Sequence, residues 1–150
     1  MRVVIQRVSF AKLTIDEKIY SEIENGLLVL IGIEEEDTEE DIEYLAGKIT
    51  KLRIFNDQNG VMNLSVNDIN GEIMAVSQFT LHALTKKGNR PSYIRACKPE
   101  KAIPLYEVFV EKLRSYNNNK VKTGVFGADM KIQLCNEGPV TIWIDSKNKE

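Results

Sequence analysis

Histidine and cysteine, which often bind catalytic zinc or serve as base and nucleophile, are nearly missing from this sequence. One histidine and two cysteines occur among 150 residues. The cysteines, Cys97 and Cys135, lack the C-x-x-C spacing of a metal or redox pair, so we expect two small, half-buried thiols in a reducing compartment. A zinc site of the usual composition cannot be built from this set, and we expect neither a metal nor another cofactor.

Long apolar runs and glycine-rich phosphate-binding patterns are also missing. No stretch of 18 apolar residues occurs, and the N-terminus alternates apolar with polar residues in place of a charged and then apolar leader. These absences predict a soluble, unprocessed, cytoplasmic protein that does not enter a membrane. Neither a P-loop nor a G-x-G-x-x-G pattern occurs, so the familiar nucleotide-binding loops are not predicted.

Charge is unevenly distributed, although the net charge is only −2. Residues 34–43 contain eight acidic residues and no basic one, whereas residues 86–101 contain six basic residues and only Glu100 as an acid. The basic segment could attract phosphate while the acidic one repels it. For the acidic run, the better interpretation is a solvated loop and helix start, because acids favour the positive end of a helix dipole.

Strand patterns dominate the sequence. Residues 2–9, 11–15, 19–24 and 27–33 are predicted as an antiparallel meander, with Asn25-Gly26 as its last turn. Further predicted strands are 72–81, 121–123, 130–135 and 140–145, and the predicted hairpin-type turns are Asn59-Gly60 and Asn70-Gly71.

Two stretches show helical spacing. Thr38 and Asp41 resemble a capping box before an apolar stripe that ends near Leu52. A second stripe follows Pro99, and Pro104 should displace its start or kink its first turn. With 43% hydrophobic residues, residues 1–150 suffice for one domain. The prediction is a single mixed α/β domain, whose largely antiparallel, barrel-like sheets carry two main helices.

The single histidine, His82, lies near two hydroxyl groups, so a Ser-His-acid hydrolase is the first chemistry to consider. On a strand, Ser77 and His82 would face opposite sides, while Thr80 and His82 would share a face about 7 Å apart. That distance excludes a direct proton relay unless the strand bends. We therefore interpret His82 as a surface or structural residue, which leaves no obvious activated nucleophile.

Two short polar segments remain. Ser77, Gln78 and Thr80 place two hydroxyls and an amide at the end of an apolar strand, and by themselves they indicate a solvated strand end. Gly138-Pro139 interrupts a strand pair, removes a backbone donor and leaves two neighbouring carbonyls free to accept hydrogen bonds. By itself, that dipeptide is typical of a hairpin turn.

Taken together, five ordered segments resemble the D-aminoacyl-tRNA deacylase family. They are MRVVIQRV at 1–8, SQFTL at 77–81, KGNRPS at 87–92, GADM at 127–130 and NEGPVT at 136–141. The similarity extends from Arg2 to about Asp145. His82 and Tyr93 depart from it, since other aromatic residues are more usual there.

The resemblance implies hydrolysis of the ester between a D-amino acid and the 3′-terminal ribose of tRNA, and also of glycyl-tRNA, as chiral proofreading in translation. It implies a homodimer, in which each active site combines two segments. One subunit would supply Ser77, Gln78, Phe79 and Thr80, and the other a cis Gly138-Pro139 dipeptide.

In such a site, the carbonyls of Gly138 and Pro139 would accept hydrogen bonds from the substrate's α-ammonium and occupy the space that an L side chain needs. Arg7 would hold the incoming dipeptide, and Met130 would line the pocket near it. Backbone N–H groups near Phe79 and Thr80 would stabilise an oxyanion.

Two mechanisms stay open, because either the ribose 2′-OH helps to activate water or Thr80 acts as a nucleophile. In the exposed basic segment 86–95, Lys86, Lys87 and Arg90 are candidates for phosphate contact near the tRNA acceptor end. Two rival functions also remain. One is hydrolysis of L-aminoacyl-tRNA on the same fold, for which a trans Gly-Pro and an altered strand motif are expected. The other is a non-catalytic tRNA-binding dimer, which needs a broader basic surface.

Overall fold

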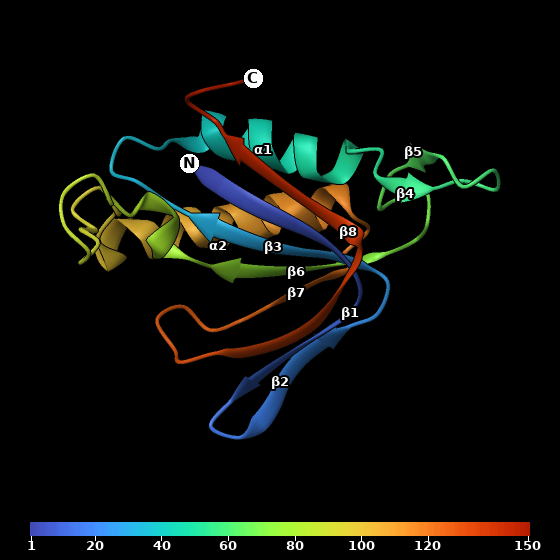
Figure 1. Ribbon diagram of the computed structural model, residues 1–150, viewed down its shortest axis with the longest axis horizontal. Helices are drawn as coiled ribbons and strands as arrows, with labels where there is room; N and C mark the ends of the chain where they lie inside the picture. Colours follow the sequence, from blue (N-terminus) through green and yellow to red (C-terminus); the bar gives the residue numbers. More distant parts are fainter.

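The computed structural model describes all 150 residues and shows a curled sheet with both long helices on one face (Figure 1). The strands are β1 (Arg2–Ile15), β2 (Lys18–Ile23), β3 (Gly26–Gly32), β4 (Phe55–Asn56), β5 (Met62–Leu64), β6 (Glu72–Ser77), β7 (Val121–Thr123) and β8 (Lys131–Asp145). The helices are α1 (Glu39–Lys51), the short 3-10 helix η1 (Phe79–His82) and α2 (Pro99–Tyr116). Neither long helix has the length and apolar character needed to cross a bilayer.

Strand β1 organises the sheet. Residues 2–8 pair antiparallel with β3, residues 11–15 pair antiparallel with β2, and β8 lies antiparallel along the other edge of both halves. β1 and β8 bend together at one end of the molecule, which curls the sheet into a nearly closed, barrel-like shape (Figure 1). The predicted fold class is therefore confirmed. The prediction of separate strands at 2–9 and 11–15 is wrong, because β1 continues through the bend.

The remaining strands extend the sheet in parallel. β6 pairs with β3 and β7 with β6, both parallel, because each connection crosses over through a helix. Asn70-Gly71 is thus a turn into β6, not a hairpin turn as predicted. Asn59-Gly60 does connect the hairpin of β4 and β5. The predicted strands 130–135 and 140–145 form one strand, β8, which absorbs the Gly138-Pro139 interruption as a shift in its register with β1.

Local signals place both helix starts. Asp41 accepts a hydrogen bond from the Thr38 backbone N–H at 2.9 Å, and the predicted capping box opens α1. α2 begins at Pro99. The predicted displacement of this start by Pro104 is not observed. Pro104 lies on the exposed side of α2, where water can bond the carbonyl group that the proline leaves without an amide partner.

The acidic run of residues 34–43 is only partly solvated, which corrects the prediction. Glu34, Asp37 and Asp41 are buried. Asp37 Oδ1 forms an ion pair with the Met1 ammonium at 2.5 Å, and Asp41 Oδ2 forms one with Lys147 Nζ at 2.8 Å. These cations come from the two ends of the chain, and buried carboxylates need such partners. Local sequence could not reveal pairs that lie more than 30 residues apart.

Two apolar clusters fill the fold. The larger one lies between the sheet and the two helices and includes the fully buried Phe109. The smaller one fills the inside of the curled sheet with side chains such as Leu13, Met74 and Val76.

Candidate active site

A pocket of about 310 Å³ opens at the carboxyl end of β6. Ser77, Gln78 and Phe79 line it as one continuous segment, and Phe126 and Met130 also line it. Ten of its 14 lining residues are hydrophobic, so the pocket suits an apolar or aromatic group with a few polar contacts at one side. The structure therefore brings Met130 to the same pocket as the Ser77–Phe79 segment.

The polar segment of this lining is a turn and not a strand. β6 ends at Ser77, and Phe79–His82 forms η1, which corrects the predicted strand 72–81. The Gln78 backbone N–H donates to the Ile31 carbonyl at 2.6 Å, and the Gln78 side-chain amide donates to Thr80 Oγ1 at 2.5 Å. Side-chain alternation therefore does not apply beyond Ser77, and Gln78 holds the hydroxyl group of Thr80 in place.

His82 is a buried structural residue. Its side chain is 0% exposed and does not line the pocket. Neither ring nitrogen makes a hydrogen bond of good geometry, although the Gly32 backbone lies close enough to act on the ring, and Nδ1 lies 3.9 Å from Glu34 Oε2. Burial lowers the pKa of His82, although the Gly32 backbone and the Glu34 carboxylate partly oppose this shift. A neutral, enclosed imidazole cannot reach a substrate in the pocket.

The unpaired ring nitrogens predict that His82→Phe stabilises the fold. Replacing a buried polar group that lacks a partner with an apolar group of similar shape should add about 1 kcal/mol to the free energy of unfolding. The melting temperature should rise by about 2–4 °C, measured by thermal denaturation. Hydrolysis of D-tyrosyl-tRNA should be unchanged. Loss of hydrolysis at an unaltered melting temperature would instead give His82 a part in the chemistry.

A basic loop, residues 85–91, stands beside the pocket. Leu84 and Ser92 exchange two backbone hydrogen bonds of 2.8 and 3.0 Å that close its base. Its cations, Lys86, Lys87 and Arg90, are exposed, and none of the salt bridges in the structure includes them. They are free to meet phosphate.

Gly138 and Pro139 form an exposed turn within β8. The register with β1 passes from Gln6↔Thr141 to Val8↔Asn136, so residues 137–140 have no partner on β1. The peptide bond between Gly138 and Pro139 is cis, and Gly138 has φ +119°.

Arg7 holds this turn from inside its own chain. Its side chain is 7% exposed, and Nε donates to the Glu137 carbonyl at 3.0 Å while Nη1 donates to the Ile54 carbonyl at 2.6 Å. The β1–β8 register places Arg7 beside the unpaired residues. Arg7 therefore holds the Gly138-Pro139 turn of its own chain through the Glu137 carbonyl. Its expected contact with the dipeptide of another copy stays a prediction.

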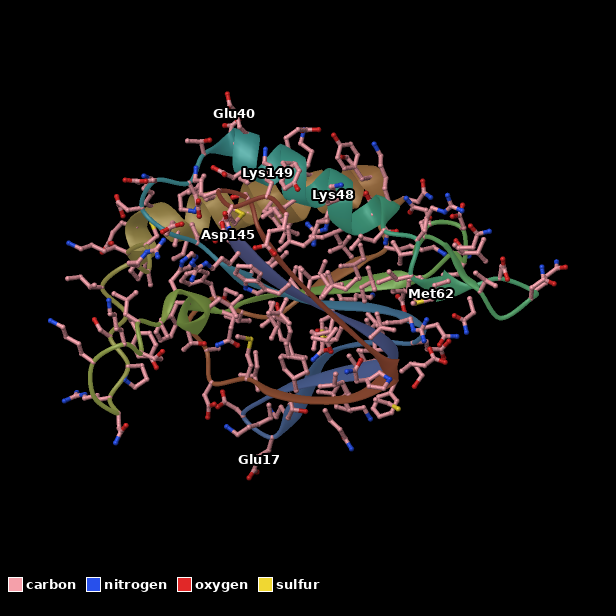
Figure 2. The ribbon with its side chains drawn as sticks, turned by 45° about the horizontal axis from the view of Figure 1, so that its top comes forward. Glu17, Glu40, Lys48, Met62, Asp145 and Lys149 are labelled. Carbon is pink, nitrogen blue, oxygen red and sulfur yellow. The ribbon has the colours of Figure 1, made fainter.

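The two polar segments lie at opposite ends of the sheet. Arg7 is in register with Leu27 and Ile73, and Ser77 lies four residues beyond Ile73 on β6. This register separates Arg7 from Ser77 by about 13 Å along the strands and about 10 Å across them. In Figure 1, the arrowhead of β6 points away from β4, the strand next to Arg7. Figure 2 marks the β4–β5 end with Met62 and the far end of β8 with Asp145. One chain therefore does not bring the two segments together.

Several pocket residues carry no signal in the sequence. Ile31 and Ile33 look like ordinary strand residues, and Cys97 looks like a small core residue. Burial raises the pKa of the Cys97 thiol to about 11, with further contributions from a hydrogen bond to Glu35 and from its charge. The thiol stays protonated near neutral pH, so it is a wall of the pocket and not a nucleophile. Cys135 is exposed, and both cysteines are free thiols.

Known proteins resemble this chain over its whole length. The family model described as D-Tyr-tRNA(Tyr) deacylase matches residues 4–145. The D-aminoacyl-tRNA deacylases of Flavobacterium psychrophilum and Parabacteroides distasonis are 67% and 64% identical over 100% of both chains. A solved structure named c-Myc DNA Unwinding Element Binding Protein is 41% identical, with a TM-score of 0.92 over 97% of this chain and 98% of that one. A probable eukaryotic D-amino acid tRNA deacylase shares the fold, with a TM-score of 0.82 at 18% identity over 95% and 97% of the two chains.

The full-length identities and the order of the five segments agree with the chemistry of the pocket. An apolar cavity that is also lined by the Gln78 amide and the Ser77 hydroxyl suits an aminoacyl ester. The chain therefore belongs to the D-Tyr-tRNA(Tyr) deacylase family, whose substrates are D-aminoacyl-tRNAs.

Proposed function

We propose that the D-aminoacyl-tRNA deacylase activity of this chain resides in active sites shared between two copies of it. Each site would combine Ser77, Gln78, Phe79 and Thr80 of one copy with Gly138-Pro139 of the other. The main support for this proposal is the position of the two segments. Each has a defined conformation within the chain, yet the two lie at opposite ends of one sheet. The Gly138-Pro139 turn is exposed, and in this proposal it enters the pocket of another copy.

In this proposal, the pocket and the Ser77–Thr80 segment bind the amino acid and stabilise the negative charge that develops on the ester carbonyl. The apolar walls of the pocket accept the amino-acid side chain. The backbone N–H groups of Phe79 and Thr80 begin η1, and the first N–H groups of a helix have no acceptor within the helix. These donors would face the ester carbonyl as it becomes an oxyanion, the step at which fixed donors contribute most.

Thr80 orients the substrate in this proposal and does not attack it. Its hydroxyl oxygen accepts a hydrogen bond from the Gln78 side-chain amide, which fixes the orientation of the hydroxyl group. The pocket contains no imidazole to remove the hydroxyl proton, and its carboxylate, Asp129, is exposed and paired with Lys131. Attack by water, assisted by the ribose 2′-OH, requires only orientation, which can contribute about 7 kcal/mol.

In this proposal, the Gly138-Pro139 turn selects the chirality of the substrate's amino acid. Arg7 donates a hydrogen bond to the Glu137 carbonyl. The next two carbonyls, those of Gly138 and Pro139, belong to residues without a partner on β1. In the partner pocket they would bind the α-ammonium and leave no space for an L side chain. Glycyl-tRNA has no side chain to exclude and would be hydrolysed. Lys86, Lys87 and Arg90 would contact phosphates near the acceptor end.

Mixing two inactive variants tests the shared site. One variant carries Gln78→Ala with Thr80→Val, and the other carries Gly138→Ala. Each alone should hydrolyse D-tyrosyl-tRNA very slowly, because every site contains one damaged half. Co-expressed, the two should recover about a quarter of the wild-type rate, since half of the dimers are mixed and each mixed dimer has one intact site.

The result that contradicts the proposal is a mixture no more active than its components, which would place each site within one chain. A rate for D-tyrosyl-tRNA equal to that for L-tyrosyl-tRNA in the wild type would remove the chiral role of Gly138-Pro139. Equal binding of charged and uncharged tRNA without turnover would indicate the non-catalytic alternative.

A further inference from the structure

Glu34 is a buried carboxylate that follows the pocket residue Ile33 in the chain. It follows β3, its side chain has little exposure, and its backbone forms an isolated bridge with Ala96. Oε2 accepts a hydrogen bond from Arg95 Nη2 at 2.7 Å and lies 3.9 Å from His82 Nδ1. Oε1 lies 4.0 Å from the Met1 ammonium. Although it belongs to the acidic run, Glu34 does not point into solvent.

The segment that returns from the basic loop is attached to the pocket at two points. The rings of Tyr93 and Phe79 pack edge to face with centroids 5.0 Å apart. Two residues later, Arg95 forms the ion pair with Glu34, and the Cys97 N–H donates to the Ile33 carbonyl at 2.9 Å. A displacement of this segment would therefore move Phe79.

Arg95 thus differs from the other cations of this region. Lys86, Lys87 and Arg90 have no carboxylate partner, whereas the charge of Arg95 is occupied by Glu34. An arginine that is held by a buried carboxylate fixes the chain on which it lies.

We infer that Glu34 is a positioning residue, which acts through Arg95 to hold the return of the basic loop, and with it Tyr93, against Phe79. The role rests on the proposed function, in which Phe79 belongs to the catalytic turn and the basic loop meets tRNA. Binding of phosphate at the basic loop and the geometry of the pocket are then linked through one ion pair.

Kinetics of Glu34→Gln test this role. The variant keeps the size of the side chain and removes its charge, and Arg95 can hydrate because its side chain is 43% exposed. We expect kcat for D-tyrosyl-tRNA to fall about tenfold, while KM changes by less than about twofold, because substrate contacts remain. Lys86→Gln with Lys87→Gln should do the reverse, raising KM and leaving kcat unchanged. Glu36→Gln is the matched control, since Glu36 is exposed and its carboxylate forms no salt bridge or hydrogen bond.

The single histidine supplies a second readout that a general loss of structure would not produce. The ionisable groups facing His82 are Glu34, Arg2 and the Met1 ammonium, and Arg95 reaches it through Glu34. Followed by the proton NMR signal of its imidazole, the pKa of His82 should fall in Glu34→Gln, which removes an anion. It should rise in Arg95→Gln, which leaves Glu34 without its cation.

A drop in kcat together with opposite shifts of the His82 pKa supports the inference. A Glu34→Gln enzyme that behaves like Glu36→Gln overturns it, and so does a fall in kcat that only follows a lower melting temperature without the opposite pKa shifts. Failure of the proposed function is distinguishable, because Gln78→Ala with Thr80→Val would then remain active whatever Glu34→Gln does.

Discussion

Gly138→Ala is expected to lower kcat/KM for D-tyrosyl-tRNA by about 100-fold, the loss that a 1 Å displacement in an active site can cause. A Cβ at Gly138 would lie 2.7 Å from Arg7 Nη2 and 2.9 Å from a methyl group of Val140, and φ of +119° is a conformation that L residues rarely adopt. Hydrogen bonds to Glu137 and Ile54 restrain Arg7, and the positive φ strains an alanine whatever the space around it. We therefore expect the turn to shift, and the carbonyl groups of Gly138 and Pro139 to shift with it.

Gly60→Ala is the matched control. Gly60 also has a positive φ, +76°, but a Cβ there meets nothing within 4 Å, and the residue lies in the β4–β5 turn. Hydrolysis of D-tyrosyl-tRNA should be normal in this variant. The same assay with L-tyrosyl-tRNA shows whether Gly138→Ala weakens discrimination. Unchanged rates for both substrates in Gly138→Ala would remove the dipeptide from the mechanism.

Gly32→Ala is expected to lower kcat by about 100-fold, as the loss of one oxyanion donor does in other hydrolases. Gly32 ends β3 beneath η1, where a Cβ would lie 2.9 Å from Leu81 Cβ, 3.1 Å from the Gln78 carbonyl oxygen and 3.1 Å from His82 Cδ2. Backbone and enclosed side chains surround the position, so η1 must lift. The N–H groups of Phe79 and Thr80 would then leave the positions at which they can meet an oxyanion.

Gly47→Ala controls for the general effect of a methyl group. Gly47 lies in α1, and a Cβ there meets nothing within 4 Å. This variant should be fully active and more stable by about 1 kcal/mol, because alanine favours a helix interior. Far-ultraviolet circular dichroism should show that Gly32→Ala keeps its secondary structure. A Gly32→Ala enzyme with normal kcat would show that η1 does not supply the donors.

Local sequence patterns were sufficient to predict most of the helices and strands. Thr38 and Asp41 open α1 through bonds within four residues, and Pro99 opens α2 because its missing N–H costs nothing at a first position. The prediction from local patterns failed where the chain bends. Residues 72–81 look like one strand by composition, but β6 ends when Gln78 turns to bond Ile31, a residue of a different strand.

The burial and the partners of charged and histidine side chains could not be predicted from local patterns either. His82 has the sequence context of an exposed strand end, yet the packing of η1 on Gly32 encloses it. Glu34 looks like part of a solvated acidic run, but its partner Arg95 lies 61 residues away. Neither burial nor an ion-pair partner is recorded in a local pattern, because both depend on which segments pack together.

By itself, the sequence determined the mixed α/β class, both helix starts, the family, and the two segments that we assign to catalysis and chiral selection, because capping, apolar periodicity and short motifs act within a few residues. Only the tertiary structure decided that these segments lie at opposite ends of one sheet, that Arg7 holds the Gly138-Pro139 turn of its own chain, and that Glu34 faces Arg95. The reason is strand register: pairing β1 with β3, and β3 with β6, sets the distance between residues that are far apart in the chain.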